Sequence, residues 1–131
     1  MSKKKEFRIE FVIRSSPVIL YNFLSTPSGL SLWFADHVDR DVDSDDAVYS
    51  FFWEGFEEKA KCIDTIENEM IRYRWLDGAD DEYFEFSIEK VDVTNDTVLV
   101  IKDFAEDYEV EDQKRLWASQ VKTLSIQIGG G

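Results

Sequence analysis

Carboxylates are the most frequent groups in this sequence that could do chemistry, and one run of them is similar to the start of a calcium-binding loop. Asp41, Asp43 and Asp45 stand at alternate positions, as the first oxygen ligands of such a loop do. The pattern then fails, because Asp46 stands where the loop needs glycine and Phe52 where it needs a bidentate glutamate. The run is therefore interpreted as a solvated acidic surface, and the sequence predicts neither a metal site nor a cofactor.

Nucleophilic and zinc chemistry lack the residues that they need. His37 is the only histidine and Cys62 the only cysteine, whereas catalytic triads and zinc sites combine several such side chains. His37 is expected on the surface, and Cys62, close to Ala60 in a strand pattern, is expected in the core. Carboxylate pairs such as Asp80 and Asp81 are too common here to indicate acid–base catalysis. The sequence therefore predicts a protein that is not an enzyme.

Aromatic side chains form the main candidate site. Their strand and helix patterns can direct them toward one interior, where they would either fill a core or, if they leave space, line a pocket for an apolar ligand. The predicted ligand-binding residues are Trp33, Phe52, Tyr73, Trp75, Phe84, Phe86 and Trp117. Between residues 49 and 53 both strand faces are aromatic, so some rings there are expected to be covered by another element, by Lys or Arg stems, or by the second subunit of a homodimer.

Charge and length limit the partners and the architecture. The 131 residues carry a formal net charge of −13, which repels nucleic acid and anionic lipid surfaces. No apolar run approaches the ~20 residues needed to span a bilayer, and nothing near the N-terminus resembles a signal peptide. A single cysteine excludes an intrachain disulfide, which predicts a reducing compartment and hence the cytoplasm. One hydrophobic core suffices at this length, so residues 1–131 are predicted to form a single domain.

The N-terminal part of the chain is predicted to hold one strand and two short helices. Apolar residues alternate over residues 5–13, which indicates a half-buried strand. The Ser-Pro step at 16–17 is suited to the start of a helix that ends near Thr26. After a break at residues 27–29, residues 30–34 fit one or two further helical turns.

The remainder is predicted to be a run of antiparallel strands followed by one long helix. The acidic stretch 37–46 is expected to be an exposed edge strand or a loop. Further strand patterns cover residues 47–53, 56–66, 69–76, 82–91 and 97–104. Apolar residues then recur at helical spacing, namely Val110, Trp117, Val121, Leu124 and Ile128. The fold class is therefore α+β, a curved antiparallel sheet of about seven strands (β-α-α-β6-α) that grips a long C-terminal helix.

Arg72 and Arg74 alternate with Ile71, Tyr73 and Trp75, so the two arginines are predicted to lie on the opposite face of their strand. Pairing with acidic residues of adjacent strands is the ordinary role of such arginines. An anion contact at the rim of the sheet is the alternative.

This order of elements, together with the segments Phe-Arg-Ile-Glu-Phe-Val-Ile-Arg-Ser-Ser-Pro, Leu-Tyr-Asn-Phe-Leu and Leu-Ser-Leu-Trp at residues 7–17, 20–24 and 30–33, resembles a known superfamily. It is the START-like, birch-pollen-allergen-type helix-grip superfamily (SRPBCC), and the closest likeness is to the branch of activators of the heat-shock-protein-ninety ATPase. The resemblance implies an apolar cavity between the concave face of the sheet and the terminal helix, which in that superfamily binds lipids, sterols or polyketides.

The leading expectation is a non-enzymatic domain that binds a small hydrophobic or amphipathic ligand, with Trp75 and Trp117 as the central wall. One alternative is a protein-interaction module that docks a chaperone or another basic partner through its acidic surface. A lesser alternative is a polyketide cyclase-like enzyme, which would need polar groups inside the cavity.

Overall fold

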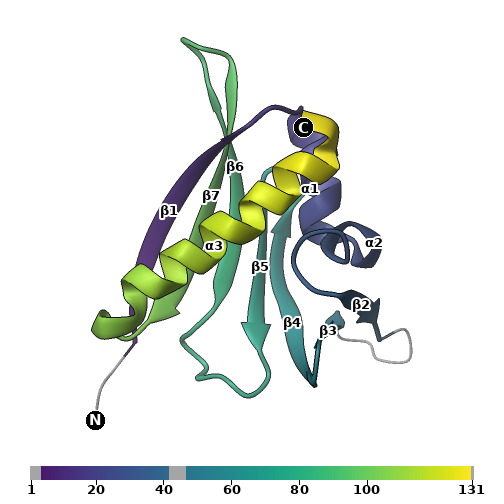
Figure 1. Ribbon diagram of the computed structural model, residues 1–131, viewed down its shortest axis with the longest axis vertical. Coiled ribbons are helices and arrows are strands. Elements are labelled where there is room, and N and C mark those ends of the chain that lie inside the picture. Colours follow the sequence, from purple (N-terminus) through teal and green to yellow (C-terminus); the bar gives the residue numbers. More distant parts are fainter. Residues whose placement is uncertain (1–3, 42–46, 131) are drawn as a thin grey trace.

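Seven antiparallel strands form a single curved sheet, and a long helix lies across one face of it (Figure 1). The computed structural model describes residues 4–41 and 47–130. The strands are β1 (Lys5–Ile13), β2 (His37–Arg40), β3 (Val48–Trp53), β4 (Phe56–Ile66), β5 (Met70–Trp75), β6 (Phe84–Val91) and β7 (Asp96–Ala105). The helices are α1 (Pro17–Ser25), α2 (Pro27–Leu30) and α3 (Val110–Ser125), with a short turn η1 (Asp107–Glu109) before α3 and a final turn η2 (Ile126–Gly130) after it. The predicted α+β helix-grip fold is confirmed.

The first strand of the chain, β1, pairs with the last one, β7. The strand order is β1-β7-β6-β5-β4-β3-β2, so β1 and β2 are the two edges. Because β1 and β2 are connected only by α1 and α2, that connection must pass from one edge of the sheet to the other. Figure 1 shows α1 and α2 beside the C-terminal end of α3, where α1 contacts β5 and β6 and α2 contacts β2.

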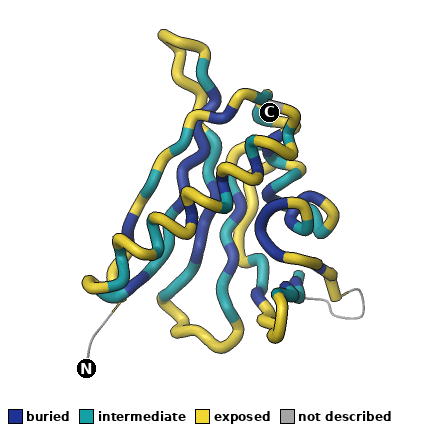
Figure 2. Tube along the Cα trace, viewed as in Figure 1, coloured by how far each residue is buried: buried dark blue, intermediate teal, exposed yellow. Residues whose placement is uncertain are grey.

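Buried residues are concentrated on the inner face of the central strands and on the side of α3 that faces them (Figure 2). Trp117, Val121 and Leu124 are the buried residues of α3, and Val110 and Ile128 pack partly against the same core. The predicted helical stripe is therefore confirmed, since all five of its members contact the core. The β6–β7 hairpin projects away from this core and is largely exposed (Figure 2).

The second helix begins earlier than predicted. Pro27 starts α2, because a proline is favoured in the first turn of a helix, and the Thr26 side chain caps that turn by accepting a hydrogen bond from Gly29 N at 3.0 Å. A Cβ on Gly29 would lie 2.4 Å from the Asn22 backbone oxygen, so glycine permits the close approach of α1 and α2. The prediction of a break at 27–29 and a helix over 30–34 was wrong, since residues 31–34 form a turn.

The acidic stretch contributes a short edge strand. Among the described strands β2 pairs with β3 alone, from His37↔Phe52 to Arg40↔Tyr49. Asp43, Asp45 and Asp46 lie outside the described residues, and so does most of the calcium-like pattern. His37 is exposed, as predicted, and its Nε2 lies 2.9 Å from Asp39 Oδ1.

The outer face of the sheet carries a buried ion pair. Arg72 donates two hydrogen bonds to Glu85 Oε1, at 2.9 and 2.6 Å, and Lys102 Nζ lies 3.7 Å from Glu85 Oε2. The guanidinium of Arg72 also lies over the ring of Tyr83, 4.2 Å from its centroid. Burial alone would raise the pKa of Glu85, but the hydrogen bonds from Arg72 and Ser87 and the two nearby cations outweigh it and lower the pKa. The predicted cross-strand pairing is confirmed for Arg72.

Replacing Arg72 by methionine should destabilise the protein by about 2 kcal/mol at neutral pH, because the buried Glu85 carboxylate would lose its closest cation and keep the hydrogen bond from Ser87 and the more distant Lys102. The lowered pKa means that this stabilisation is present above the ordinary pKa of a glutamate and is lost as the pH falls through the lowered value. Urea unfolding over a pH series measures both effects. The double variant Arg72→Met/Glu85→Met is the control and should recover most of the loss, whereas a loss that does not change with pH would contradict this account.

Candidate functional site

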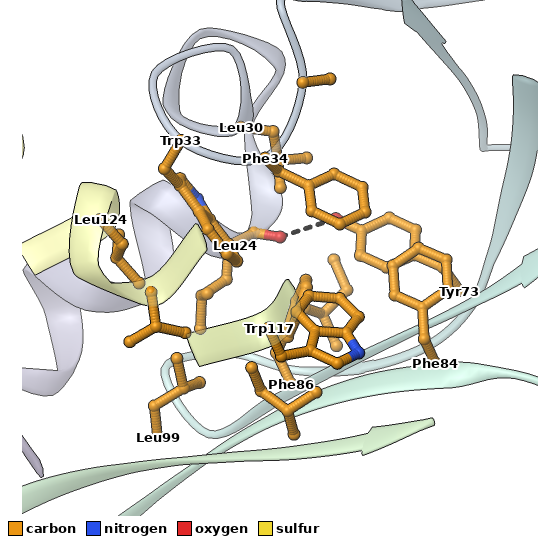
Figure 3. Packing of buried hydrophobic residues seen from close by; sticks show 14 of the residues in the cluster. Leu24, Leu30, Trp33, Phe34, Tyr73, Phe84, Phe86, Leu99, Trp117 and Leu124 are labelled. Atoms are coloured by element: carbon orange, nitrogen blue, oxygen red, sulfur yellow. Dashed lines mark hydrogen bonds between the residues drawn. The ribbon is translucent and has the colours of Figure 1, made fainter. Parts of the chain in front are cut away.

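The inner face of the sheet holds a cluster of aromatic rings that meet at Phe34 (Figure 3). The Phe34 ring stacks on Phe84 of β6 and on Trp117 of α3, with centroids 5.6 Å away in both cases. It also meets Phe51 of β3 edge-on at 5.2 Å. Phe34 is 5% exposed, although it belongs to the turn that follows α2 and not to a strand or helix. One side chain of a connecting segment thus fills the space between the sheet and the helix.

The backbone of Phe34 fixes this position. Its carbonyl oxygen accepts a hydrogen bond from Trp53 Nε1 at 3.1 Å and another from Gln120 Nε2, also at 3.1 Å. The first donor belongs to β3 and the second to α3, so a single carbonyl joins the connecting segment to both layers. A buried backbone oxygen needs a hydrogen-bond partner, and this one has two.

Three of the predicted ligand-binding residues are part of the closed core. Tyr73 donates a hydrogen bond to the Leu24 backbone oxygen at 2.7 Å, and burial raises the pKa of its hydroxyl. Trp33 Nε1 donates to the Phe23 backbone oxygen at 2.8 Å. Phe86 is 0% exposed, with its ring 5.5 Å from that of Trp33. These three side chains connect α1 and the turn after α2 to the sheet, and the polar atoms of the first two are already satisfied by the protein.

The other inward-facing residues line an open groove beside this core. The groove has a volume of about 540 Å³ and lies between α3 and one end of strands β3 to β7. Its lining residues are Phe34, Trp53, Phe56, Glu58, Trp75, Phe84, Asp103, Gln113, Leu116, Trp117 and Gln120. Trp75, Phe84 and Trp117 are therefore the predicted residues that the structure brings together in the groove. Phe84 and Trp117, like Phe34, are buried members of the core as well as lining residues, whereas Trp75 is only partly buried.

The structure does not bring Phe52 to this site. Tyr49 and Phe51 are buried on the inner face of β3, so Phe52, between Phe51 and Trp53, faces the opposite side, where its ring is 5.6 Å from that of His37. Placing Phe52 with the inward residues was wrong, because a strand with aromatic residues on both faces gives no periodicity signal for the choice. The rings of Tyr49 and Phe51 are covered by the chain's own elements, which is one of the alternatives that the sequence left open.

Two inward-facing carboxylates, Asp103 and Glu58, were not identified from the sequence. Asp103 follows Leu99 and Ile101 on the inner face of β7, and Glu58 precedes the buried Ala60 on the inner face of β4. The alternation of each strand could have identified them, since every second residue shares a face. No such signal exists for Phe34, which is placed by a turn.

Asp103 is the less exposed of these two acids. Its Oδ2 accepts a hydrogen bond from Trp117 Nε1 at 2.9 Å, and its Oδ1 accepts one from the Phe104 backbone N–H at 2.8 Å. Burial raises the pKa of Asp103, and these two hydrogen bonds only partly oppose the effect. The same hydrogen bond holds the indole of Trp117 in place as the wall of the groove.

A second recess of about 570 Å³ lies away from α3 and is lined by Tyr21, Ser25, Arg40, Ala47, Tyr49, Cys62, Ile63, Asp64, Thr65 and Ile71. Cys62 is half-buried there and packs against the core, and burial raises the pKa of its thiol. A raised pKa reduces the thiolate fraction and with it the nucleophilicity. Within residues 4–41 and 47–130, no group of three or more His, Cys, Asp or Glu side chains could hold a metal ion. None of the described helices is both long and apolar enough to cross a membrane.

Known proteins share the sequence pattern and the fold of this chain. Residues 1–130 match the family described as START-like superfamily domain. BfR322 from Bacteroides fragilis has a solved structure that is 35% identical in sequence, with a TM-score of 0.66 over 95% of this chain and 90% of that one. No curated protein matches the sequence.

Two further solved structures share the fold at lower identity. The Aha1 dimer from Colwellia psychrerythraea is 18% identical, with a TM-score of 0.71 over 92% of this chain and 93% of that one. CalU16 from Micromonospora echinospora is 12% identical, with a TM-score of 0.71 over 95% of this chain and 74% of that one. At these identities the likeness concerns the fold.

Replacing Phe34 by alanine should lower the free energy of unfolding by about 3–5 kcal/mol, because it removes the ring that fills the space between β6 and α3. Phe52→Ala makes the same chemical change on the outer face and should cost only about 1 kcal/mol. Urea unfolding of the two variants beside the unmodified protein measures the difference. Equal losses would show that Phe34 does not have the central place assigned to it.

Proposed function

Because this chain belongs to the START-like superfamily, we propose that it is a non-enzymatic domain that binds a small amphipathic molecule in the groove between its sheet and α3. The observation that supports this most is the groove itself. Its volume of about 540 Å³ falls within the ~300–1,000 Å³ of small-molecule sites. Aromatic side chains form most of its wall, with a few polar groups among them, as is common where a ligand is held by apolar contact and oriented by a small number of hydrogen bonds.

The geometry favours a ligand that enters from one end and does not penetrate the whole interior. Phe34, Phe84 and Trp117 stack closely enough to exclude a ligand from the region beyond them. Trp75 and Leu116 lie nearer the opening, and Leu116 is 52% exposed although it is a large apolar residue. An apolar side chain at the lip of a groove gains free energy when a ligand covers it.

The arrangement of polar groups supports binding more than catalysis. The described lining residues include no histidine, cysteine, serine or lysine, and both oxygens of Asp103 accept hydrogen bonds from the protein. Asp103 is the one inward acid that a cyclase-like enzyme could use from this depth, so that alternative depends on a carboxylate which already has a structural role. The chaperone-associated alternative depends on the acidic surface and stays a prediction.

Replacing Leu116 by glutamine should weaken the binding of a neutral apolar probe by about fivefold, because it removes roughly 1 kcal/mol of apolar contact at the lip of the groove. Titration with the neutral dye Nile red, followed by the increase in its emission, measures the affinity. Ile126→Gln is the matched control, since Ile126 lies further along the same helical segment, is 54% exposed and does not line the groove. Failure of the dye to bind, or equal weakening by the two substitutions, would count against the groove as the binding site.

A further inference from the structure

The ionisable residues that line the groove are all acidic. Glu58 of β4 and Asp103 of β7 point into it, and the described lining residues include no lysine or arginine. On the outer face of the sheet, by contrast, the buried Glu85 is paired with Arg72 and Lys102. The negative charge of the groove therefore has no cation of the protein's own among the lining residues to balance it.

A smaller recess of about 350 Å³ adjoins the groove and extends this charge. The two share Glu58, Trp75, Asp103 and Gln113 as lining residues. The recess adds Glu82, Glu109 and Lys4, and the ammonium of Lys4 lies 3.9 Å from Glu82. Four carboxylates thus face one ammonium across the joined space, which leaves a formal charge of −3. A field of one sign in a partly enclosed space raises the local concentration of ions of the opposite sign.

Indole and phenyl rings stand beside these carboxylates. The ring centroids of Trp53 and Trp75 are 6.2 Å apart, and the Trp75 ring stacks on that of Phe84 with centroids 4.8 Å apart. Aromatic faces attract organic cations through the ring quadrupole, and tryptophan does so most strongly. Aromatic walls with carboxylates at their margin are the combination that holds an ammonium group attached to an apolar body.

On this charge complementarity we propose that the groove selects an organic cation, a molecule with an amine or quaternary ammonium group on an aromatic or aliphatic body. The inference rests on the proposed function and narrows its ligand class. The apolar body contacts Trp75, Phe84 and Trp117, and the ammonium lies toward Glu58 and Asp103. Fatty acids and phosphorylated ligands are selected against, because each would bring a negative charge next to two carboxylates.

Three ligands that share a naphthyl body and differ in the charge of their head group test the inference, namely 2-naphthylmethyl-trimethylammonium, 2-naphthylmethanol and 2-naphthoate, each titrated by isothermal calorimetry. The cation should bind at least about 10-fold more tightly than the alcohol, and the carboxylate more weakly than the alcohol. In Glu58→Gln/Asp103→Asn the preference for the cation over the alcohol, both measured on the same variant, should fall below about threefold. Glu58→Gln alone, at an exposed position, should reduce the preference in part and decides the matter if the double variant does not fold.

A matched control separates the local effect from the net charge of the protein. Glu57→Gln/Glu111→Gln also removes two negative charges, at exposed positions that do not line the groove, and should keep the full preference. Equal affinities for the cation and the alcohol would overturn the inference and leave the proposed binding function standing. Loss of the preference in the control to the same extent would also overturn it. If none of the three ligands binds, both the inference and the proposed function fail.

Discussion

A seven-stranded sheet with one apolar face must have that face covered, and here a single aromatic side chain determines how the covering elements meet. Phe34 occupies the space between β6 and α3, in stacking contact with a ring on each side. Its carbonyl accepts hydrogen bonds from Trp53 of β3 and from Gln120 of α3, which tie the backbone of this turn to both layers. Phe34 thus belongs both to the buried core and to the lining of the groove.

Two carboxylates, one on each face of the sheet, differ in how their charge is compensated. Glu85 on the outer face has two cationic partners, which outweigh its burial and lower its pKa. Asp103 on the inner face has neutral hydrogen-bond donors, an indole N–H and a backbone N–H, and burial raises its pKa. On the outer face, away from the groove, the buried carboxylate is paired with cations. The uncompensated charge lies where the chain presents an accessible aromatic surface, and residues of that kind are often found at functional sites.

The superfamily fold itself limits function only loosely, because one scaffold can carry many unrelated sites. The feature of this chain that bears on function is the content of its groove, three tryptophans and two carboxylates between the sheet and α3. The tryptophans favour a ligand with apolar surface, and the two carboxylates favour a ligand with a positive charge. The whole chain is acidic, with 28 acidic and 15 basic residues, and this net charge also attracts cations and repels anions.

The sequence by itself determined the elements and most of their facing, because alternation in strands and a 3.6-residue period in helices are local properties. It placed Tyr73, Trp75, Phe84 and Phe86 on one face of the sheet and Trp117 on the facing side of the helix. The same alternation could have identified Asp103, which the sequence interpretation did not name. Only the tertiary structure decided the place of Phe34, the division between core and groove, and the outward direction of Phe52. Each of these depends on contacts between residues far apart in the chain, and local periodicity carries no information about such contacts.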